Sequence, residues 1–389
     1  MRIGFVSPYY YPAMIGGIEW YLYHVSRLLA RKGHEVEVFT TNAGATRKDL
    51  PAEEDSEGVR IHRFRPALDV TYRIKLWPSL IPRLRSNDLQ VVHAFDYAQF
   101  HDLAVALARA SSGWRSVVTV YDVHSQIPRA PAKSAALRVF DHYLAGAILR
   151  AFDKVLVRTP YQAEFARGLG IGEERLELAP PGIDDESFEE VEAKKIQEVR
   201  ARYACDGSHM ILYVGRIHPI KGIDVLIRAL AWLKGRGLRA RLIVVGPDQS
   251  GYTPTLQRLA STLDVAGMVI FTGYLEEDEK RRLQAASDVA VLPSSFEGFG
   301  QALIQAMAHG TPVIGTNVGG IPWVLEQGNA GLLVPYGDHV SLAKSIERIV
   351  SDDDLRRSLV QRGRERARQF SYPALVENLE AIYRRLCAT

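Results

Sequence analysis

The sequence predicts an α/β fold in which two Rossmann-like domains each hold a parallel sheet. Short apolar runs such as 3–7 and 35–40 alternate with amphipathic stretches such as 19–32. This alternation is typical of parallel strands joined by covering helices, and a second series of the same kind starts at 209–214. A chain of 389 residues also exceeds one ordinary hydrophobic core, which favours two domains.

The first domain is expected to alternate strands and helices along its whole length. The stretch 19–32 has apolar residues at helical spacing and stops at Gly33, a residue type that commonly ends helices. Another helix is expected at 103–110. The expected strands are short and apolar, and they cover residues 3–7, 35–40, 59–64, 91–94, 116–121 and 154–158.

The second domain repeats this pattern after a junction. Residues 178–184 carry turn-forming prolines and a glycine before a charged stretch, so they mark the junction. The end of the chain is helical in pattern, and Pro373 indicates a bend. We therefore expect domains at 1–183 and 184–370, followed by a final helix at 371–389. The expected strands cover residues 209–214, 240–245, 268–271, 286–292, 312–316 and 331–334.

Composition excludes several classes of protein. The net charge of +3 is too small to indicate a nucleic-acid-binding protein. Two cysteines cannot form a disulfide framework, and no apolar run reaches the roughly 18 residues of a membrane span. The first residues have the pattern of a strand rather than a signal peptide. These features predict a cytoplasmic protein.

Residues 60–85 are unusually basic. Arginines and lysines recur there with Asp69 as the only acid, and Phe64, Tyr72 and Trp77 lie among them. Such a mixture can contact an anionic membrane surface, which would place the protein peripherally on the inner face of the membrane. It can equally be a solvated face around a few core aromatics. No recognised nucleic-acid-binding motif accompanies the charges.

The most informative segment begins at Pro293. An apolar strand ends there, Glu297 follows, and glycines lead into a helix that starts at Gln301. In a parallel sheet this order places Glu297 at the carboxyl end of a strand, where such folds bind ligands. The N–H groups of 298–300 open a helix and suit an anionic group. A carboxylate for sugar hydroxyls beside amides for phosphate predicts a nucleotide-sugar site.

A second candidate loop follows the strand at 209–214. It holds Arg216 and Lys221 between Gly215 and Gly222. Arginine binds phosphate oxygens in a bidentate manner, and lysine acts as a point charge. Two cations there would stabilise the negative charge that develops on a leaving diphosphate.

The segment from Pro293 to Val313 resembles the Glu-x7-Glu signature of the large family of retaining glycosyltransferases with the GT-B fold, known as glycosyl transferases group 1 or family 4-like. The resemblance runs from Ile3 to Leu386. It implies two domains facing a cleft, with the final helix crossing back to the N-terminal domain. It also implies a UDP-, GDP- or ADP-linked sugar as substrate, and a glycan or lipid-linked acceptor of envelope polysaccharide or glycolipid synthesis.

The resemblance assigns roles to matching residues. Glu297, Arg216, Lys221 and His124 are the implied catalytic group. No paired-aspartate motif is present, so no metal and no cofactor is expected. The implied donor-binding residues are Gly16, Gly17, Gly215, Arg216, Lys221, Ser295, Glu297, Gly298, Phe299, Gly300 and Gln305, and the acceptor-side residues are Asp96, Tyr121 and Asp122.

The sequence departs from the family pattern at three polar positions. Tyr121 stands where the family commonly has histidine, with His124 three residues later. Gln305 and Trp323 stand where it usually has glutamate, and Gln305 loses the charge-assisted hydrogen bond to ribose. Two alternatives therefore stay open beside transfer: a non-catalytic nucleotide-sugar-binding homologue or scaffold, and a nucleotide-sugar epimerase.

Overall fold

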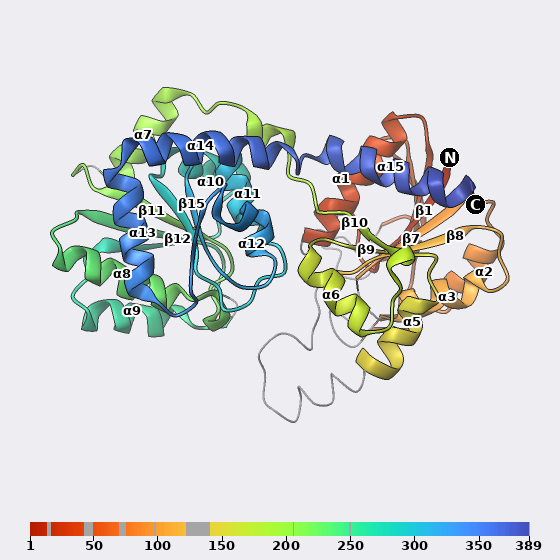
Figure 1. Ribbon diagram of the computed structural model, residues 1–389. Coiled ribbons are helices and arrows are strands. Elements are labelled where there is room, and N and C mark those ends of the chain that lie inside the picture. Colours follow the sequence, from red (N-terminus) through yellow and green to blue (C-terminus); the bar gives the residue numbers. More distant parts are fainter. Residues whose placement is uncertain are drawn as a thin grey trace. The chain divides into compact units, whose positions relative to one another are not determined.

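The chain folds into two compact units (Figure 1). It passes from the first unit to the second and then returns to the first for its last helix. One unit is Met1–Gly182 with Tyr372–Thr389, and the other is Ile183–Ser371. The expected boundaries, 183/184 and 370/371, differ from these junctions by one residue each. The computed structural model describes residues 1–13, 17–42, 50–69, 75–96, 99–121, 141–204, 206–248 and 250–388.

The N-terminal unit is built on an eight-stranded sheet of order β10-β9-β8-β7-β1-β2-β4-β3. Its neighbours pair in parallel except the acidic edge strand β3, which runs antiparallel to β4. Its strands are β1 Arg2–Val6, β2 Glu35–Thr41, β3 Glu53–Ser56, β4 Val59–Phe64, β7 Val91–Phe95, β8 Arg115–Thr119, β9 Lys154–Val157 and β10 Leu176–Leu178, with a separate pair, β5 Leu68–Asp69 and β6 Lys75–Leu76. Its helices include α1 Gly17–Arg31, α2 Leu80–Arg85, α3 Phe100–Arg109, α5 Gly146–Arg150, α6 Pro160–Gly168 and α15 Tyr372–Ala388.

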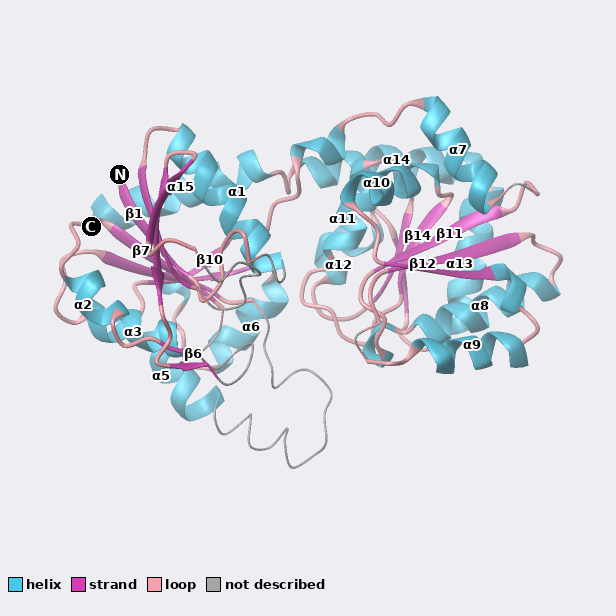
Figure 2. Ribbon diagram, turned by 180° about the vertical axis from the view of Figure 1, so that it is seen from behind, coloured by secondary structure: helices cyan, strands magenta, loops and turns pink. Residues whose placement is uncertain are grey.

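The C-terminal unit holds a parallel sheet of order β13-β12-β11-β14-β15-β16 (Figure 2). Strand order reverses between β11 and β14, which makes this pair the switch point of a Rossmann-like sheet. Its strands are β11 His209–Val214, β12 Ala240–Val245, β13 Val269–Gly273, β14 Val289–Leu292, β15 Val313–Thr316 and β16 Leu332–Val334. Its helices include α7 Ala193–Tyr203, α8 Ile223–Gly235, α9 Thr253–Thr262, α10 Glu277–Ala286, α11 Gln301–Ala308, α12 Ile321–Val324, α13 His339–Ser351 and α14 Asp353–Arg368.

Helices cover both faces of the second sheet. Helices α8, α9 and α13 pack together on one face, while α7, α10, α11 and α14 lie on the other (Figures 1 and 2). The strands between them are almost entirely buried, which explains why they appear in the sequence as continuous apolar runs.

The final helix, α15, belongs to the N-terminal unit, as expected. It packs against α1, and its apolar face is buried. Beneath this helix, three buried polar side chains are linked by hydrogen bonds. The Tyr383 hydroxyl lies 2.6 Å from Nδ1 of His93, whose Nε2 lies 2.7 Å from the Thr119 hydroxyl. These bonds satisfy polar groups that burial would otherwise leave without water.

The basic segment 60–85 is largely tied down in its described part. Trp77 is completely buried, and Arg63 and Lys75 are buried and paired with acids. Residues 70–74 lie outside the described part of the chain. These contacts favour the interpretation of a charged face around core aromatics. Within the described ranges, no helix has both the length and the apolarity needed to cross a bilayer.

Asp288 fixes the start of β14 beside β11. Its Oδ2 accepts hydrogen bonds from Arg200 Nη2 at 3.1 Å and from the Met210 N–H at 2.7 Å. Its own N–H donates to the Met210 carbonyl at 3.0 Å. The carboxylate is shielded from water, so its loss would leave a guanidinium and an amide without their acceptor.

Asp288→Asn is therefore expected to destabilise the C-terminal unit by about 1–3 kcal/mol, because a charge-assisted network is broken. Urea unfolding of the variant measures the loss. Asp264→Asn is the matched control, since exposed Asp264 forms its one ion pair among the described residues with Lys234 at the surface. Its unfolding midpoint should not move, and equal losses in the two variants would contradict the assignment.

Candidate functional site

The candidate site of the C-terminal unit lies where β11 and β14 end. Ile211 and Leu212 pair with Val289 and Ala290, so the two strands run side by side and finish at the same edge of the sheet. The loop 215–222 leaves β11 there, and the segment 293–300 leaves β14. The two loops that the sequence singled out are therefore neighbours.

Lys221 and Glu297 meet across these loops. Lys221 Nζ lies 2.7 Å from Glu297 Oε2, and the side chains are only 14% and 18% exposed. The backbone N–H and the hydroxyl of Ser295 both donate to the Ile220 carbonyl, at 2.8 and 3.0 Å. The ion pair is thus held by two loops that hydrogen-bond to each other. In a partly shielded site its Coulomb attraction is stronger than at an open surface.

Two glycines allow this close packing of loops. Gly222 has φ +67°, and a Cβ there would lie 2.0 Å from the Pro293 carbonyl oxygen. Gly319 has φ +55°, and a Cβ there would lie 2.0 Å from the Glu297 carbonyl oxygen. The N–H of Gly320 donates to that same carbonyl at 2.9 Å. The backbone of Glu297 is therefore positioned by a third loop, which follows β15.

Arg216 offers a cation without a local counter-charge. Its carbonyl accepts a hydrogen bond from the Tyr213 hydroxyl at 2.8 Å, which holds the backbone after β11. Its guanidinium is exposed and forms no hydrogen bond or ion pair within the described part of the chain. Lys221, in contrast, is already neutralised by Glu297. An anion that enters the site would find Arg216 unengaged.

The segment after Glu297 opens helix α11. Gly300 caps the helix at φ +90° and makes no side-chain cap hydrogen bond, because it has no side chain. Gly298 and Phe299 are buried beside it. The first-turn amides of α11 thus carry no side-chain cap, an arrangement that suits a phosphate or a carboxylate.

Trp323 packs behind this segment. The Arg366 guanidinium lies 4.8 Å from the Trp323 ring centre and donates to the Trp323 carbonyl at 2.9 Å. Phe370 stacks edge-on against both Trp323 and Phe299, with centroids 5.7 and 5.5 Å apart. Trp323 is therefore part of the packing that supports Phe299.

Sequence reasoning missed Arg366 and Phe370. Arg366 is 8% exposed, yet it is one of several arginines in α14, and only burial distinguishes it from the others. Phe370 follows the helix in a stretch with no functional pattern. No signal in the single sequence would have selected either residue.

Gln305 lies further along α11 and faces a small cavity of the same unit. Asp184, Lys280 and His309 also line that cavity. Burial and the nearby carboxylates of Glu277 and Glu186 raise the pKa of Asp184 to about 6. Burial, followed by nearby cations, lowers the pKa of His309 to about 4. Within the described ranges, no hydrogen bond joins Gln305 to the Lys221–Glu297 pair.

In the N-terminal unit, three expected residues follow neighbouring strands. Gly17 begins α1 after β1 and has open space around it, Asp96 directly follows β7, and Tyr121 follows β8. Asp96 has φ +101°, a sparsely populated conformation for a residue with a side chain. The expected residues Gly16, Asp122 and His124 lie outside the described part of the chain.

Tyr121 is a core residue rather than an open one. It is 7% exposed, and its ring meets Tyr21 edge-on at 5.9 Å with Arg158 4.8 Å from its centre. Its carbonyl accepts a hydrogen bond from Gln162 Nε2 at 2.6 Å. Burial raises the pKa of its hydroxyl.

Family descriptions match both halves of the chain. Glycosyl transferases group 1 matches residues 195–366, and Glycosyltransferase Family 4 matches residues 15–187. D-inositol 3-phosphate glycosyltransferase of Acidothermus cellulolyticus is 30% identical over 391 residues, covering 95% of this chain and 85% of the relative. An uncharacterized glycosyltransferase of Methanocaldococcus jannaschii is 26% identical and aligns over 99% of this chain and 98% of its own length.

Solved structures share the fold. Sucrose-phosphate synthase from Thermosynechococcus elongatus superposes with a TM-score of 0.80 at 25% identity and covers 99% of both chains. Anabaena HepE, solved in complex with UDP and glucose, gives a TM-score of 0.76 at 20% identity over 98% of this chain and 99% of its own. The expected GT-B fold class is confirmed by this likeness.

Gly319→Ala tests the close approach that positions Glu297. The added methyl group meets the Glu297 carbonyl, and the alanine has to adopt a left-handed backbone conformation. The free energy of unfolding measured in urea melts should therefore fall by at least about 2 kcal/mol. Gly337→Ala is the control, because Gly337 has φ +82° but open space around it. The free energy of unfolding of this control should fall by only about 1 kcal/mol, which is the cost of placing alanine in a left-handed conformation. Equal losses would show that the contact with Glu297 is unimportant.

Proposed function

The chain belongs to the glycosyl transferases group 1 family, and from this premise we propose that it transfers a sugar from a nucleotide-sugar donor with retention of configuration. The Lys221–Glu297 pair at the switch point carries this proposal. The pair places a cation that can bind a diphosphate next to a carboxylate that can accept hydrogen bonds from sugar hydroxyls. These are the two chemistries that a nucleotide sugar presents at one end.

The cations have distinct roles in the proposal. Arg216 binds the diphosphate first, because its guanidinium has no competing partner within the described residues. Lys221 then shares its charge between Glu297 and a phosphate oxygen. Glu297 accepts hydrogen bonds from the donor sugar, and the amides near Gly300 face the phosphates. Two cations beside the leaving diphosphate supply the counter-charge that a divalent metal supplies in other enzymes, so we propose transfer without metal.

The reaction proposed is a front-face substitution. The acceptor oxygen bonds to the anomeric carbon while the bond from that carbon to the diphosphate oxygen breaks. The acceptor proton passes to the departing phosphate oxygen. No side chain is proposed as a covalent nucleophile. Exclusion of water from the site suppresses hydrolysis of the donor.

The acceptor is proposed to meet the N-terminal unit. Asp96 follows β7 there, and we propose it for the acceptor side with Asp122, whereas Gly16 and Gly17 are proposed for the donor and His124 for catalysis. The buried ring of Tyr121 makes it a support for that edge. We propose a glycan or lipid-linked acceptor of envelope synthesis. The relatives named for D-inositol 3-phosphate make that compound a useful member of an acceptor panel.

Two further assignments stay proposals. Gln305 is proposed at the ribose, although it lines the small cavity with Asp184 and Lys280. We also propose a peripheral position on the cytoplasmic side of a membrane, through residues 60–85. No contact in the described part of the chain supports this position. Co-sedimentation with anionic vesicles at low salt tests that position.

The donor site is tested by calorimetric titration of UDP, GDP and ADP and their common sugars without added metal. UDP is the natural first probe, because the solved structure of HepE holds it. One nucleotide is expected to bind, and Arg216→Ala should weaken it by about tenfold or more because a bidentate phosphate contact is lost. Arg348→Ala, an exposed arginine of α13, should leave affinity unchanged.

These titrations, combined with product analysis in the presence and absence of acceptors, separate the alternatives. No binding across the panel would contradict the donor site. Binding with no transfer to any acceptor would favour the non-catalytic homologue or scaffold. Release of free sugar and nucleotide without an acceptor would favour the epimerase.

The stereochemistry gives an independent test. For any acceptor that is glycosylated, the anomeric proton of the product should show the same configuration as the donor in NMR spectra. The initial rate should be the same in excess chelator, because Arg216 and Lys221 carry the charge. An inverted product would contradict front-face substitution, and a rate abolished by chelator would contradict transfer without metal.

A further inference from the structure

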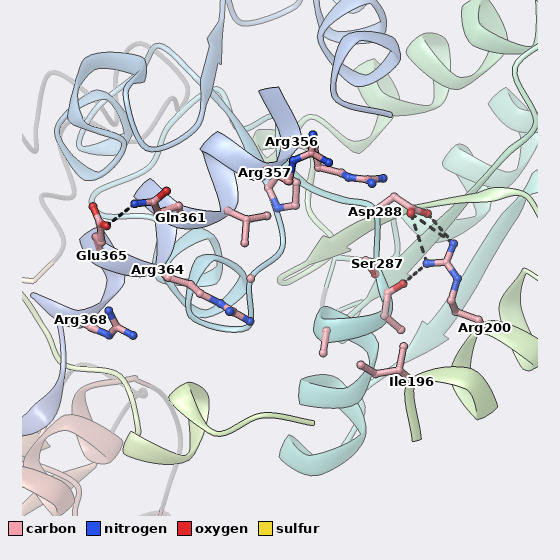
Figure 3. A pocket seen from close by; sticks show the side chains of 15 residues that line it. Ile196, Arg200, Ser287, Asp288, Arg356, Arg357, Gln361, Arg364, Glu365 and Arg368 are labelled. Carbon is pink, nitrogen blue, oxygen red and sulfur yellow. Dashed lines mark hydrogen bonds and ion pairs between the residues drawn. The ribbon is translucent and has the colours of Figure 1, made fainter. Parts of the chain in front are cut away.

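A second cavity lies at the opposite edge of the C-terminal sheet, where the strands begin. It has a volume of about 550 Å³, which is the size of small-molecule sites. Helix α14 forms one wall, and α7 with the start of β14 forms the other (Figure 3). Asp288 and Pro312, which precede β14 and β15, form part of its lining. The cavity is therefore separate from the Lys221–Glu297 site, which lies at the strands' carboxyl ends.

The lining of this cavity is strongly cationic. Arg200 is neutralised by Asp288, and Arg356 and Arg357 pair with acids outside the cavity. The acid Glu365 on the rim accepts a hydrogen bond from Gln361 at 3.1 Å. The complete set of charged lining residues is Arg200, Asp288, Arg356, Arg357, Arg364, Glu365 and Arg368.

Arg364 and Arg368 are the two cations left over. Neither forms a hydrogen bond or ion pair within the described part of the chain, although both also line an adjoining hollow whose wall includes the carboxylates of Glu189 and Glu190. They are four residues apart on α14, so they lie on one helix face and repel each other. Such a pair is stabilised when an anion lies between the two guanidinium groups.

Gly310 leaves room for Arg364. A Cβ at Gly310 would lie 2.6 Å from Nη2 of Arg364, so the guanidinium lies directly on the backbone that follows α11. The negative end of the α11 dipole favours a cation there. That attraction accounts for the position of Arg364 but not for Arg368. Arg368 is exposed, so water solvates its guanidinium unless an anion displaces that water.

We propose that this cavity binds a phosphate monoester. The arginine forks of Arg364 and Arg368 would hold the phosphate in the bidentate manner that guanidinium groups favour. The Ser287 hydroxyl donates to the Leu283 carbonyl at 2.7 Å and can accept a hydrogen bond from a hydroxyl group of the ester. Gln361 offers a second polar contact, and Val360 gives an apolar one. The same chemistry is presented by a soluble phosphate ester and by a lipid with a phosphate monoester head group.

Binding there has a structural consequence. The cavity includes Arg200 and Asp288, which fix the start of β14 beside β11. A ligand that binds the folded unit and not the unfolded chain stabilises the fold by mass action. The thermal midpoint of the protein should therefore rise with ligand concentration. This inference does not depend on the proposed donor site.

Glycerol 3-phosphate is the soluble probe, titrated by calorimetry into the full chain at low ionic strength. Wild-type protein should bind it, and Arg364→Gln with Arg368→Gln should weaken binding by about tenfold or more. Arg228→Gln, an exposed arginine of α8 on the other face of the sheet, is the matched control and should bind as wild type does. If the double variant does not keep the wild-type urea midpoint, Arg368→Gln alone replaces it.

A donor-site double variant, Arg216→Gln with Lys221→Gln, separates the two sites. If this donor-site variant binds glycerol 3-phosphate with unchanged affinity, the result supports the cavity. If it loses affinity while the variant of Arg364 and Arg368 does not, the phosphate binds at the donor site and the proposal is overturned. Vesicles with and without phosphatidate form the second arm. Arginine-dependent binding of phosphatidate vesicles alone supports the cavity with a lipid source. No arginine-dependent binding in either arm overturns the proposal.

Discussion

The parallel pairing of β11 with β14 is the constraint on which the C-terminal unit depends. Asp288 fixes the first residues of this pair through Arg200 and Met210. Because the strands then run in register, their ends deliver two loops to the same edge of the sheet. Lys221 and Glu297, far apart in sequence, meet there at 2.7 Å. The chemistry proposed for the site is therefore a consequence of strand order.

Backbone contacts give this arrangement its precision. The carbonyls of Pro293 and Glu297 lie so close to neighbouring loops that only glycine is accommodated at Gly222 and Gly319. Phe299 is supported from behind by Phe370, whose partners include the ring of Trp323. Trp323 is thus part of the packing behind the segment that carries Glu297.

Arginine has three different environments in this unit, although the sequence presents all of them alike. Arg366 is buried, and it stacks on aromatic rings and donates to carbonyls. Arg200 neutralises a structural carboxylate. Arg364 and Arg368 form no ion pair in the described chain and line a cavity. The two edges of one sheet therefore present two cationic surfaces, each with a different geometry around the charge.

The sequence by itself determined the fold class, most strands of both sheets and the two loops at the switch point, because buried parallel strands leave continuous apolar runs and loop chemistry is local. It missed the two edge strands of the first sheet: β3, Glu53–Ser56, is largely acidic, and β10, Leu176–Leu178, has only three residues. Only the tertiary structure decided which charges are paired, that Tyr121 is buried, and that Gln305 faces the cavity with Asp184. Burial and pairing depend on residues that are distant in sequence, and a local pattern carries no information about them.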